Sequence, residues 1–404
     1  MFLSPNIMSM KRPLKEPITW IIFVLIFCVL SYASLPLSFV RFSLTISVML
    51  KNILLFFIPF LIFSGTASAL SAFKGNGVQF VVTMMTIIIM SNFCNVMFSG
   101  LIGYYLIPLT SVAGQSIPLV DTQCSIKPFF TFQLPCLLPN TWALIGGLAV
   151  GILTSCFHWS KVQRGVKSLH KLVMQCMLKG FIPLLPFFLM GFILKLLLEG
   201  QMFYFVATNA KSCVLMIVVL FLYLSLWLVM AGRCSRMPLG LILRNIFPAM
   251  MTGASTMSSA AALPFSIEAA TKNTKDPVLA NAVMPISLNF HMVGDTICIP
   301  ILAMIIMNTF SYPMPDFLTL ITFGFCFVLN KFAGAGIPGG TIMVSLPILQ
   351  NYFGFSEEML ALITAFYMLI DPMTTLGNVT ANNLLVVFIN RCWGHKKRRA
   401  ASKA

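Results

Sequence analysis

Residues 371–382 read Asp-Pro-Met-Thr-Thr-Leu-Gly-Asn-Val-Thr-Ala-Asn, a polar segment between two apolar ones. Its polar positions recur at i, i+4, i+7 and i+11, a spacing that places them on one face of a helix: Asp371, Thr375, Asn378 and Asn382. The flanks, 361–370 and 384–389, are nearly all apolar. An ionised carboxylate in hydrocarbon is costly, so this face must line protein or water. The segment predicts a helix that forms one wall of a site.

The composition predicts an all-α membrane protein. Of 404 residues, 58% are hydrophobic and 9% are charged, whereas soluble domains carry about a quarter charged residues. Apolar runs of about 20 residues, long enough to span a bilayer, recur along the chain. We expect eight spans, near 17–37, 45–70, 78–108, 141–159, 180–198, 212–231, 280–308 and 359–390. No small-residue cleavage site follows the first run, so we interpret it as a span and not as a signal peptide.

Two further stretches, 246–270 and 318–353, are apolar but are broken by small residues and proline. With the N-terminus in the cytoplasm, the basic loops and the tail 391–404 fall inside only if both stretches are re-entrant hairpins of opposite orientation. The alternative, two full spans, would move Lys272 and Lys275 outside. We therefore expect both termini in the cytoplasm, and we attribute the net charge of +16 to topology, with no nucleic-acid partner.

The sequence offers little for catalysis. Eleven cysteines are scattered without a CxxC pair or a metal-ligand spacing, so no metal is assigned. Cys124 and Cys136 share a predicted outer loop and could bridge in an oxidising compartment; free thiols are the alternative. We find no nucleotide-binding loop, no HExxH motif and no nucleophile–base constellation, and we expect that the protein is not an enzyme and has no organic cofactor.

The two predicted hairpins have different tips. The first carries small hydroxyl residues before Pro264, among them Ser258 and Ser259; their hydroxyls suit a ligand carboxylate, although such runs also serve close helix packing. The second reads Ala-Gly-Ala-Gly-Ile-Pro-Gly-Gly-Thr over 333–341, and unwound backbone at that depth offers N–H and C=O groups to a ligand. Lys331 precedes this tip and either faces inward or snorkels outward.

The seventh predicted span contains a second cluster of polar residues. Gly294 lies in its middle and favours local unwinding, with His291 before it and Asp295 after it. Asp295 and Asp371 are the only acidic residues inside the eight predicted spans.

The order of serine-rich hairpin, broken seventh helix, Gly-Pro hairpin and polar eighth helix resembles the dicarboxylate/amino acid:cation symporter family. The resemblance is close from about residue 248 to 389 and is mainly one of hydropathy before that. It implies a homotrimer with an elevator-like transport domain. Residues 1–245 would be mainly scaffold, with the third and sixth spans joining the transport core formed by 246–390, followed by the basic tail 391–404.

The resemblance also assigns substrate contacts. Ser258 and Ser259 would face the substrate carboxylate, residues Gly336, Ile337, Pro338 and Gly339 would form the gate, and Asp371 would pair with the α-amino group, with Thr375 and Asn378 further along. Thr374 stands where members that carry acidic amino acids have an arginine, so we expect a neutral amino acid. Asp295 stands where the family has a threonine near the substrate side chain, so a cationic substrate is the first alternative; acidic amino acids or dicarboxylates are another.

The cation machinery departs from the family pattern. Val293 and Asn382 replace acids that ligate sodium, and Lys331 replaces a small residue near a sodium site. The residues assigned to a cation or its substitute are Ser287, Asn289, His291, Met292, Lys331, Gly334, Asn378 and Asn382. We expect sodium coupling that is weak or absent, with Lys331 supplying positive charge or His291 carrying a proton. The predicted function is secondary transport of amino acids across a cytoplasmic membrane; a channel or a non-transporting membrane protein of the same fold is the rival.

Overall fold

The computed structural model describes residues 17–71, 78–110, 126–132, 134–135, 140–157, 159–176, 179–180, 182–334 and 339–401. These residues are helical or irregular and contain no strand. In chain order the helices are α1 (Pro17–Ser31), α2 (Leu37–Ser71), α3 (Val78–Thr110), α4 (Asn140–Phe157), α5 (Ser160–Cys176), the 3-10 turn η4 (Ile182–Leu184), α6 (Leu185–Leu198), α7 (Gln201–Ser235), α8 (Leu239–Thr256), α9 (Leu263–Thr274), α10 (Pro277–Phe290), α11 (Val293–Thr309), α12 (Phe317–Gly334), α13 (Gly340–Phe353) and α14 (Glu357–Ala401).

The described helices have the make-up of a membrane protein. Four stretches are long and apolar enough to cross a bilayer: Val82–Thr110, Met202–Ser235, Pro277–Thr309 and Glu357–Arg391. Shorter apolar stretches occur in α2, α4, α6 and α12. The helical architecture and its apolar faces agree with the predicted class.

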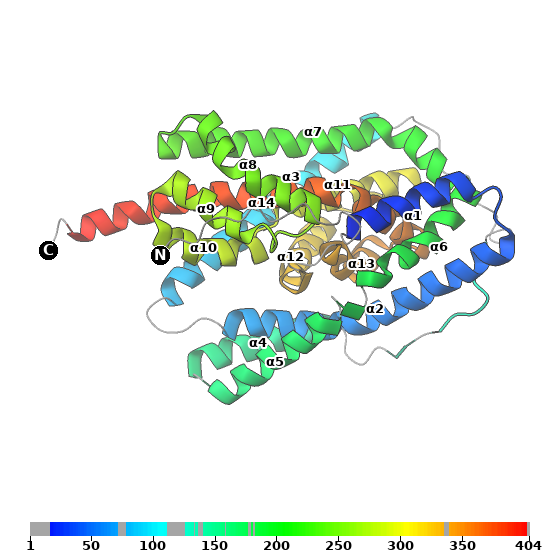
Figure 1. Cartoon of the computed structure of the whole chain (residues 1–404), viewed down its shortest axis with the longest axis horizontal. Helices are drawn as coiled ribbons and strands as arrows, with labels where there is room; N and C mark the ends of the chain where they lie inside the picture. Colours follow the sequence, from blue (N-terminus) through cyan, green and yellow to red (C-terminus); the bar gives the residue numbers. More distant parts are fainter. Residues whose placement is uncertain are drawn as a thin grey trace, which may run out of the picture.

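The interior is built around α11. Every residue of α11 except Asn308 is buried, and the helix contacts α3, α7 and α14. In Figure 1, α7 runs along the top of the molecule, whereas α2, α4 and α5 run along the bottom, where α2 packs against both of the others. Helices α3, α7 and α14 therefore enclose α11.

Both predicted hairpins are pairs of helices in contact. In the first, α8 ends at Thr256 in a left-handed Met257 (φ 50°), and α9 begins at Leu263 with a proline in its first turn, where a missing N–H costs no hydrogen bond. In the second, α12 ends at Gly334 and α13 begins after Gly339, whose φ of 66° suits glycine. The gate residues Gly336, Ile337 and Pro338 lie outside the described residues.

The seventh span is interrupted, as the sequence predicts. Helix α10 ends at Phe290 and α11 begins at Val293, with His291 and Met292 in non-helical conformations between them. Gly294, the residue that suggested unwinding, lies just after the break. Two half-helix ends therefore meet inside the core.

Several elements differ from the prediction; the second span, for example, begins at Leu37 instead of near 45. The sixth span begins at Gln201 instead of near 212, because its first turns contain Thr208, Asn209 and Lys211, which lower the local hydropathy. Asn209 donates to the Phe205 carbonyl within the same helix. The stretch between the fourth and fifth predicted spans contains the amphipathic helix α5, which the prediction did not include and which packs against α2. Cys124 and Cys136 both lie outside the described residues.

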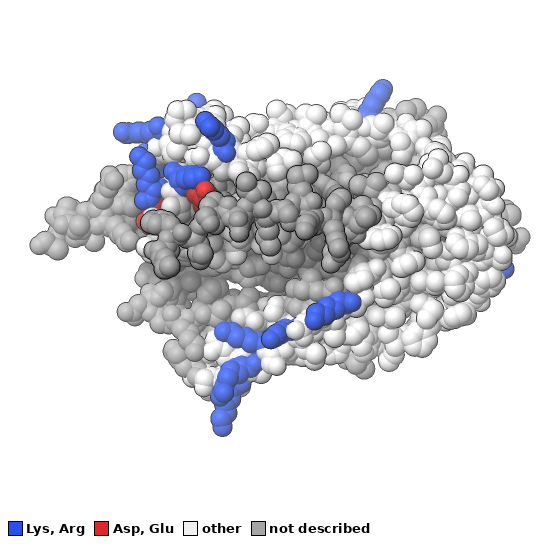
Figure 2. Space-filling model, viewed as in Figure 1, with Lys and Arg blue, Asp and Glu red and all other residues white. Residues whose placement is uncertain are grey.

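The basic side chains on the visible face are unevenly placed. Figure 2 shows Lys and Arg gathered at the end where the C-terminal part of α14 emerges, and beside α5. Exposed basic residues in those parts include Arg233, Arg236 and Arg244 around the α7–α8 turn, and Lys272 and Lys275 at the end of α9.

Candidate functional site

The break between α10 and α11 is held by a side chain from another helix. Asn92 of α3 donates to the Phe290 carbonyl (2.6 Å) and accepts from the Met292 N–H (3.3 Å). These bonds satisfy backbone groups that the interrupted helix leaves without partners. The first turn of α11 is thereby fixed in the protein interior, with Asp295 in it.

Helices α11 and α14 approach each other at Gly294. A Cβ at this position would lie 2.0 Å from the Thr374 carbonyl oxygen, so only glycine fits. The Gly294 N–H donates to Asn378 Oδ1 (2.8 Å). This contact brings the polar face of α14 against the start of α11.

Asp371 is a buried carboxylate with neutral partners. The side chain is 3% exposed. Its Oδ2 accepts from the Gly339 N–H (2.9 Å), and its Oδ1 accepts from Thr375 (3.2 Å), Thr374 (3.3 Å) and Tyr367 (3.4 Å). Among the described residues no Lys or Arg reaches this carboxylate within 4.0 Å. The site can therefore take a cation from outside the chain.

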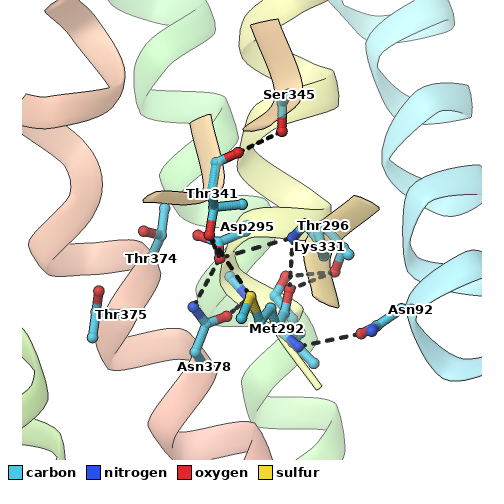
Figure 3. Close-up of polar contacts among 12 residues, drawn as sticks. Asn92, Met292, Asp295, Thr296, Lys331, Thr341, Ser345, Thr374, Thr375 and Asn378 are labelled. Carbon is cyan, nitrogen blue, oxygen red and sulfur yellow. Dashed lines mark hydrogen bonds and ion pairs between the residues drawn. The ribbon is translucent and has the colours of Figure 1, made fainter. Parts of the chain in front are cut away.

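Asp295 lies close by and is bonded differently (Figure 3). Its Oδ2 lies 3.8 Å from Lys331 Nζ and accepts from Thr341 (3.0 Å) and Asn378 (3.1 Å). Its Oδ1 accepts from the Tyr367 hydroxyl (2.8 Å). Because one O–H donates well to one acceptor at a time, Tyr367 favours Asp295 over Asp371.

Lys331 points into the protein. Its side chain is 1% exposed, and Nζ also donates to the Met292 carbonyl (3.5 Å) and lies 4.7 Å from the centre of the Phe327 ring. The alternative that Lys331 snorkels outward is wrong, because a carboxylate and a carbonyl oxygen within the core receive the ammonium.

His291 forms a separate cluster. Its Nδ1 lies 3.0 Å from Asn382 Oδ1, its Nε2 lies 3.0 Å from Ser91 Oγ, and its ring lies against Trp227. A neutral ring fits both contacts, with Nδ1–H donating to Asn382 and Ser91 donating to Nε2. The nearness of Asp295 in the sequence favoured a functional role for His291 over that of an interior histidine with satisfied hydrogen bonds, but in the structure the two side chains have separate sets of partners.

Comparison with known proteins supplies the family. A profile of the sodium:dicarboxylate symporter family matches residues 18–392. The chain belongs to this family.

Its curated relatives include two proteins named serine/threonine transporter SstT. The one from Acinetobacter baylyi is 24% identical over 158 residues, 38% of this chain and 39% of the relative. The one from Acinetobacter baumannii is 24% identical over 136 residues, 34% of each chain. The matched segments thus span well under half of each relative.

The family is one of symporters, which are transport proteins and not enzymes. The sequence resemblance noted above is confirmed by this match. The roles assigned to individual residues remain predictions.

The other predicted residues are placed as follows. Ser258 and Ser259 are half-buried at the tip of the first hairpin, and the adjoining arm lies against α14, where a Cβ on Gly253 would come within 3.5 Å of Thr375. Ser287 is buried and donates to the Met284 carbonyl. Two remaining candidates are defined by backbone alone: Asn289 lies in α10, and Gly334 is the last residue of α12.

Several functional candidates were missed from the sequence. Tyr367 lies one turn before Asp371 on the same helix face, so the i−4 spacing could have identified it. Thr341 directly follows the Gly-Pro tip. On α3, Ser91, Asn92, Asn95 and Ser99 form a polar stripe in an apolar span, and Ser99 donates to the Thr296 carbonyl (2.9 Å).

Proposed function

We propose that this member of the symporter family transports a neutral amino acid, with Asp371 receiving the substrate ammonium. The observation that carries the proposal is a buried carboxylate whose described partners are all neutral donors. A buried charge without a counter-charge is costly. A substrate ammonium would supply that counter-charge and would gain a charge-assisted hydrogen bond.

The substrate carboxylate needs donors on the opposite side. Ser258 and Ser259 supply hydroxyls at the first hairpin tip, whereas the N–H of Gly339 at the start of α13 already donates to Asp371. A zwitterion would therefore meet a carboxylate at its ammonium end and hydroxyl donors at its carboxylate end.

A neutral side chain fits the remaining surroundings best. Thr374 is buried and offers no positive charge to a second carboxylate. The cationic alternative assigned Asp295 to a substrate Lys or Arg, but Lys331 and three neutral donors already bind that carboxylate. The names of the two Acinetobacter relatives, serine/threonine transporters, agree with a small neutral substrate.

A cavity of about 320 Å³ lies elsewhere and is a weaker candidate. It is lined by residues of α2, α6 and the start of α14, including Lys195 and Glu358. These charges already pair with each other, since Lys195 Nζ lies 3.7 Å from Glu358 and 3.9 Å from Glu199. Among the described residues around this cavity, the charges are paired or exposed, so none of them requires a zwitterion.

The proposal includes the finer architecture that the sequence suggested. Eight spans and two oppositely oriented re-entrant hairpins would form a homotrimer in a cytoplasmic membrane, with both termini inside. Residues 246–390 would move as an elevator-type transport core against the scaffold of residues 1–245. The two helix pairs α8–α9 and α12–α13, together with the broken α10–α11 pair, support this arrangement.

Counterflow in proteoliposomes tests the function. Vesicles loaded with unlabelled serine or threonine should accumulate labelled serine transiently, with saturation at high external concentration. A carrier exchanges substrates in this way and a channel does not. Flux that never saturates and ignores internal serine would favour the channel alternative.

We expect acidic amino acids to be poor substrates. Excess aspartate should inhibit labelled serine uptake at least about tenfold less than threonine does, because a second carboxylate would remain unpaired at Thr374. In Thr374→Arg, aspartate should become the better competitor of the two. An unmodified protein that already prefers aspartate or succinate would contradict the neutral assignment.

A further inference from the structure

We propose that Lys331 is a tethered coupling cation: its ammonium occupies the place of an ion from solution and makes substrate binding independent of sodium. The inference rests on the proposed amino acid transport and concerns how that site is charged. The name of the family includes sodium, which leads one to expect sodium-coupled binding. The proposal predicts that this chain differs from its family in that respect.

The buried charges in the second half of the chain are nearly balanced by the chain itself. From α8 onward, the described buried residues that bear full charges are Asp295, Asp371 and Lys331. Asp295 and Lys331 form an ion pair of 3.8 Å at 2% and 1% exposure. A carboxylate this deep requires a cation, and here the chain itself supplies one. Only Asp371 is left to take a mobile cation, the substrate ammonium.

The Lys331 ammonium is surrounded by oxygen atoms of the kind that bind metal cations. Asp295 Oδ2 and the Met292 carbonyl both face Nζ (Figure 3). Carboxylate and carbonyl oxygens of this kind are also the ligands that hard cations prefer. The Met292 carbonyl lies at the α10–α11 break, where it also accepts from the N–H (3.0 Å) and the hydroxyl (2.9 Å) of Thr296. An ammonium on a side chain thus fills a position whose oxygens suit a metal cation.

Both helices of the second hairpin contact Asp295. Lys331 on α12 and Thr341 on α13 flank the tip of the second hairpin, and both reach Asp295 on α11. From the same tip, Gly339 donates to Asp371, and Tyr367 lies between the two carboxylates. The Lys331–Asp295 pair therefore holds the second hairpin next to Asp371, the residue proposed to bind the substrate ammonium.

The functional consequence follows from linkage. An ion from solution can drive substrate binding only if it binds the substrate-bound form more tightly than the free form. At this position the cation is covalently part of α12, so its concentration cannot change. Substrate binding would then depend on the substrate alone.

Sodium replacement by choline at fixed pH tests the inference, with two readouts. The first is the Kd for serine of purified protein. The second is the unfolding temperature without any amino acid. For the unmodified protein we expect the Kd to change by less than about twofold, and sodium should leave the unfolding temperature unchanged.

Lys331→Met keeps the apolar part of the side chain, which is shorter by the ammonium group, and leaves Asp295 without a cation. In choline, its affinity for serine should fall at least about tenfold, and sodium should restore part of the loss and raise its unfolding temperature. The double variant Lys331→Met with Asp295→Asn removes both charges and should respond to sodium no more than the unmodified protein does. Lys272→Met is the matched control, because Lys272 forms an exposed pair with Glu268 on α9.

A Kd that is at least tenfold weaker in choline for the unmodified protein would overturn the inference, as would sodium stabilisation of the unmodified protein. These arms need no variant to fold. If no amino acid binds in either medium, the proposed function fails, whereas the unfolding temperatures still test the role of Lys331.

Discussion

Asp371→Asn is expected to abolish amino acid binding while the protein still folds. The substitution removes the charge that would meet the substrate ammonium but keeps the shape of the side chain. One amide oxygen can still accept from Gly339 or a neighbouring hydroxyl, and hydroxyls can rotate to accept from the amide nitrogen. Leaving a buried charge of the ligand unpaired costs about 2–5 kcal/mol, so the Kd should rise at least about 30-fold.

Equilibrium binding to purified protein measures this effect, and the unfolding temperature monitors the fold. Asp316→Asn is the matched control: Asp316 is exposed and caps α12 by accepting from the Thr319 N–H (2.8 Å), a role that asparagine also fills. Wild-type affinity in Asp371→Asn would refute the assigned role of this carboxylate.

Gly294→Ala should disrupt both stability and binding. The added methyl group would lie 2.0 Å from the Thr374 carbonyl oxygen and 2.7 Å from its carbon. These are backbone atoms, so no side-chain rotation relieves the clash and α11 must move away from α14. Overpacking of this kind costs about 1–3 kcal/mol or more. The shift would also displace Asp295, the next residue, from Asn378 and Tyr367.

A lowered unfolding temperature together with lost serine binding is the expected result for Gly294→Ala. Gly165→Ala provides the comparison, because a Cβ on Gly165 in α5 meets no atom within 4 Å and alanine favours a helix. Equal unfolding temperatures for the two variants would show that the close approach of α11 and α14 is not required.

The order and approximate positions of most helices could be predicted from the sequence, because the length of an apolar run and the residues that interrupt it are properties of a short segment. The break at residues 291–292 shows where local information stops. Gly294 indicated a weak point in the span, but the break lies where Asn92, some 200 residues earlier in the chain, satisfies the freed backbone groups. Helix α5 was not among the predicted elements because its basic residues exclude a membrane span, although its buried positions Gln163, Val166 and Val173 follow a helical spacing.

The candidate site could be predicted in part. Asp371, Thr375 and Asn378 stand out because polar residues are rare in apolar spans, and their shared helix face follows from spacing alone. The pairing of Lys331 with Asp295 depends on how α12 packs beside α11, which no local pattern determines. Tyr367 was overlooked because a tyrosine among apolar residues usually indicates packing. Its hydroxyl acquires a role only when the second carboxylate lies next to it.

The role of Asp371 as the receptor of a substrate ammonium is tested most directly by removing that ammonium from the ligand. Binding of L-serine to the purified protein should be compared with binding of 3-hydroxypropanoate, which is serine without its amino group. We expect saturable binding of serine. The affinity for the deaminated analogue should be at least about 100-fold weaker, because the missing amino group leaves Asp371 without a cation. Equal or tighter binding of the deaminated analogue would contradict the account.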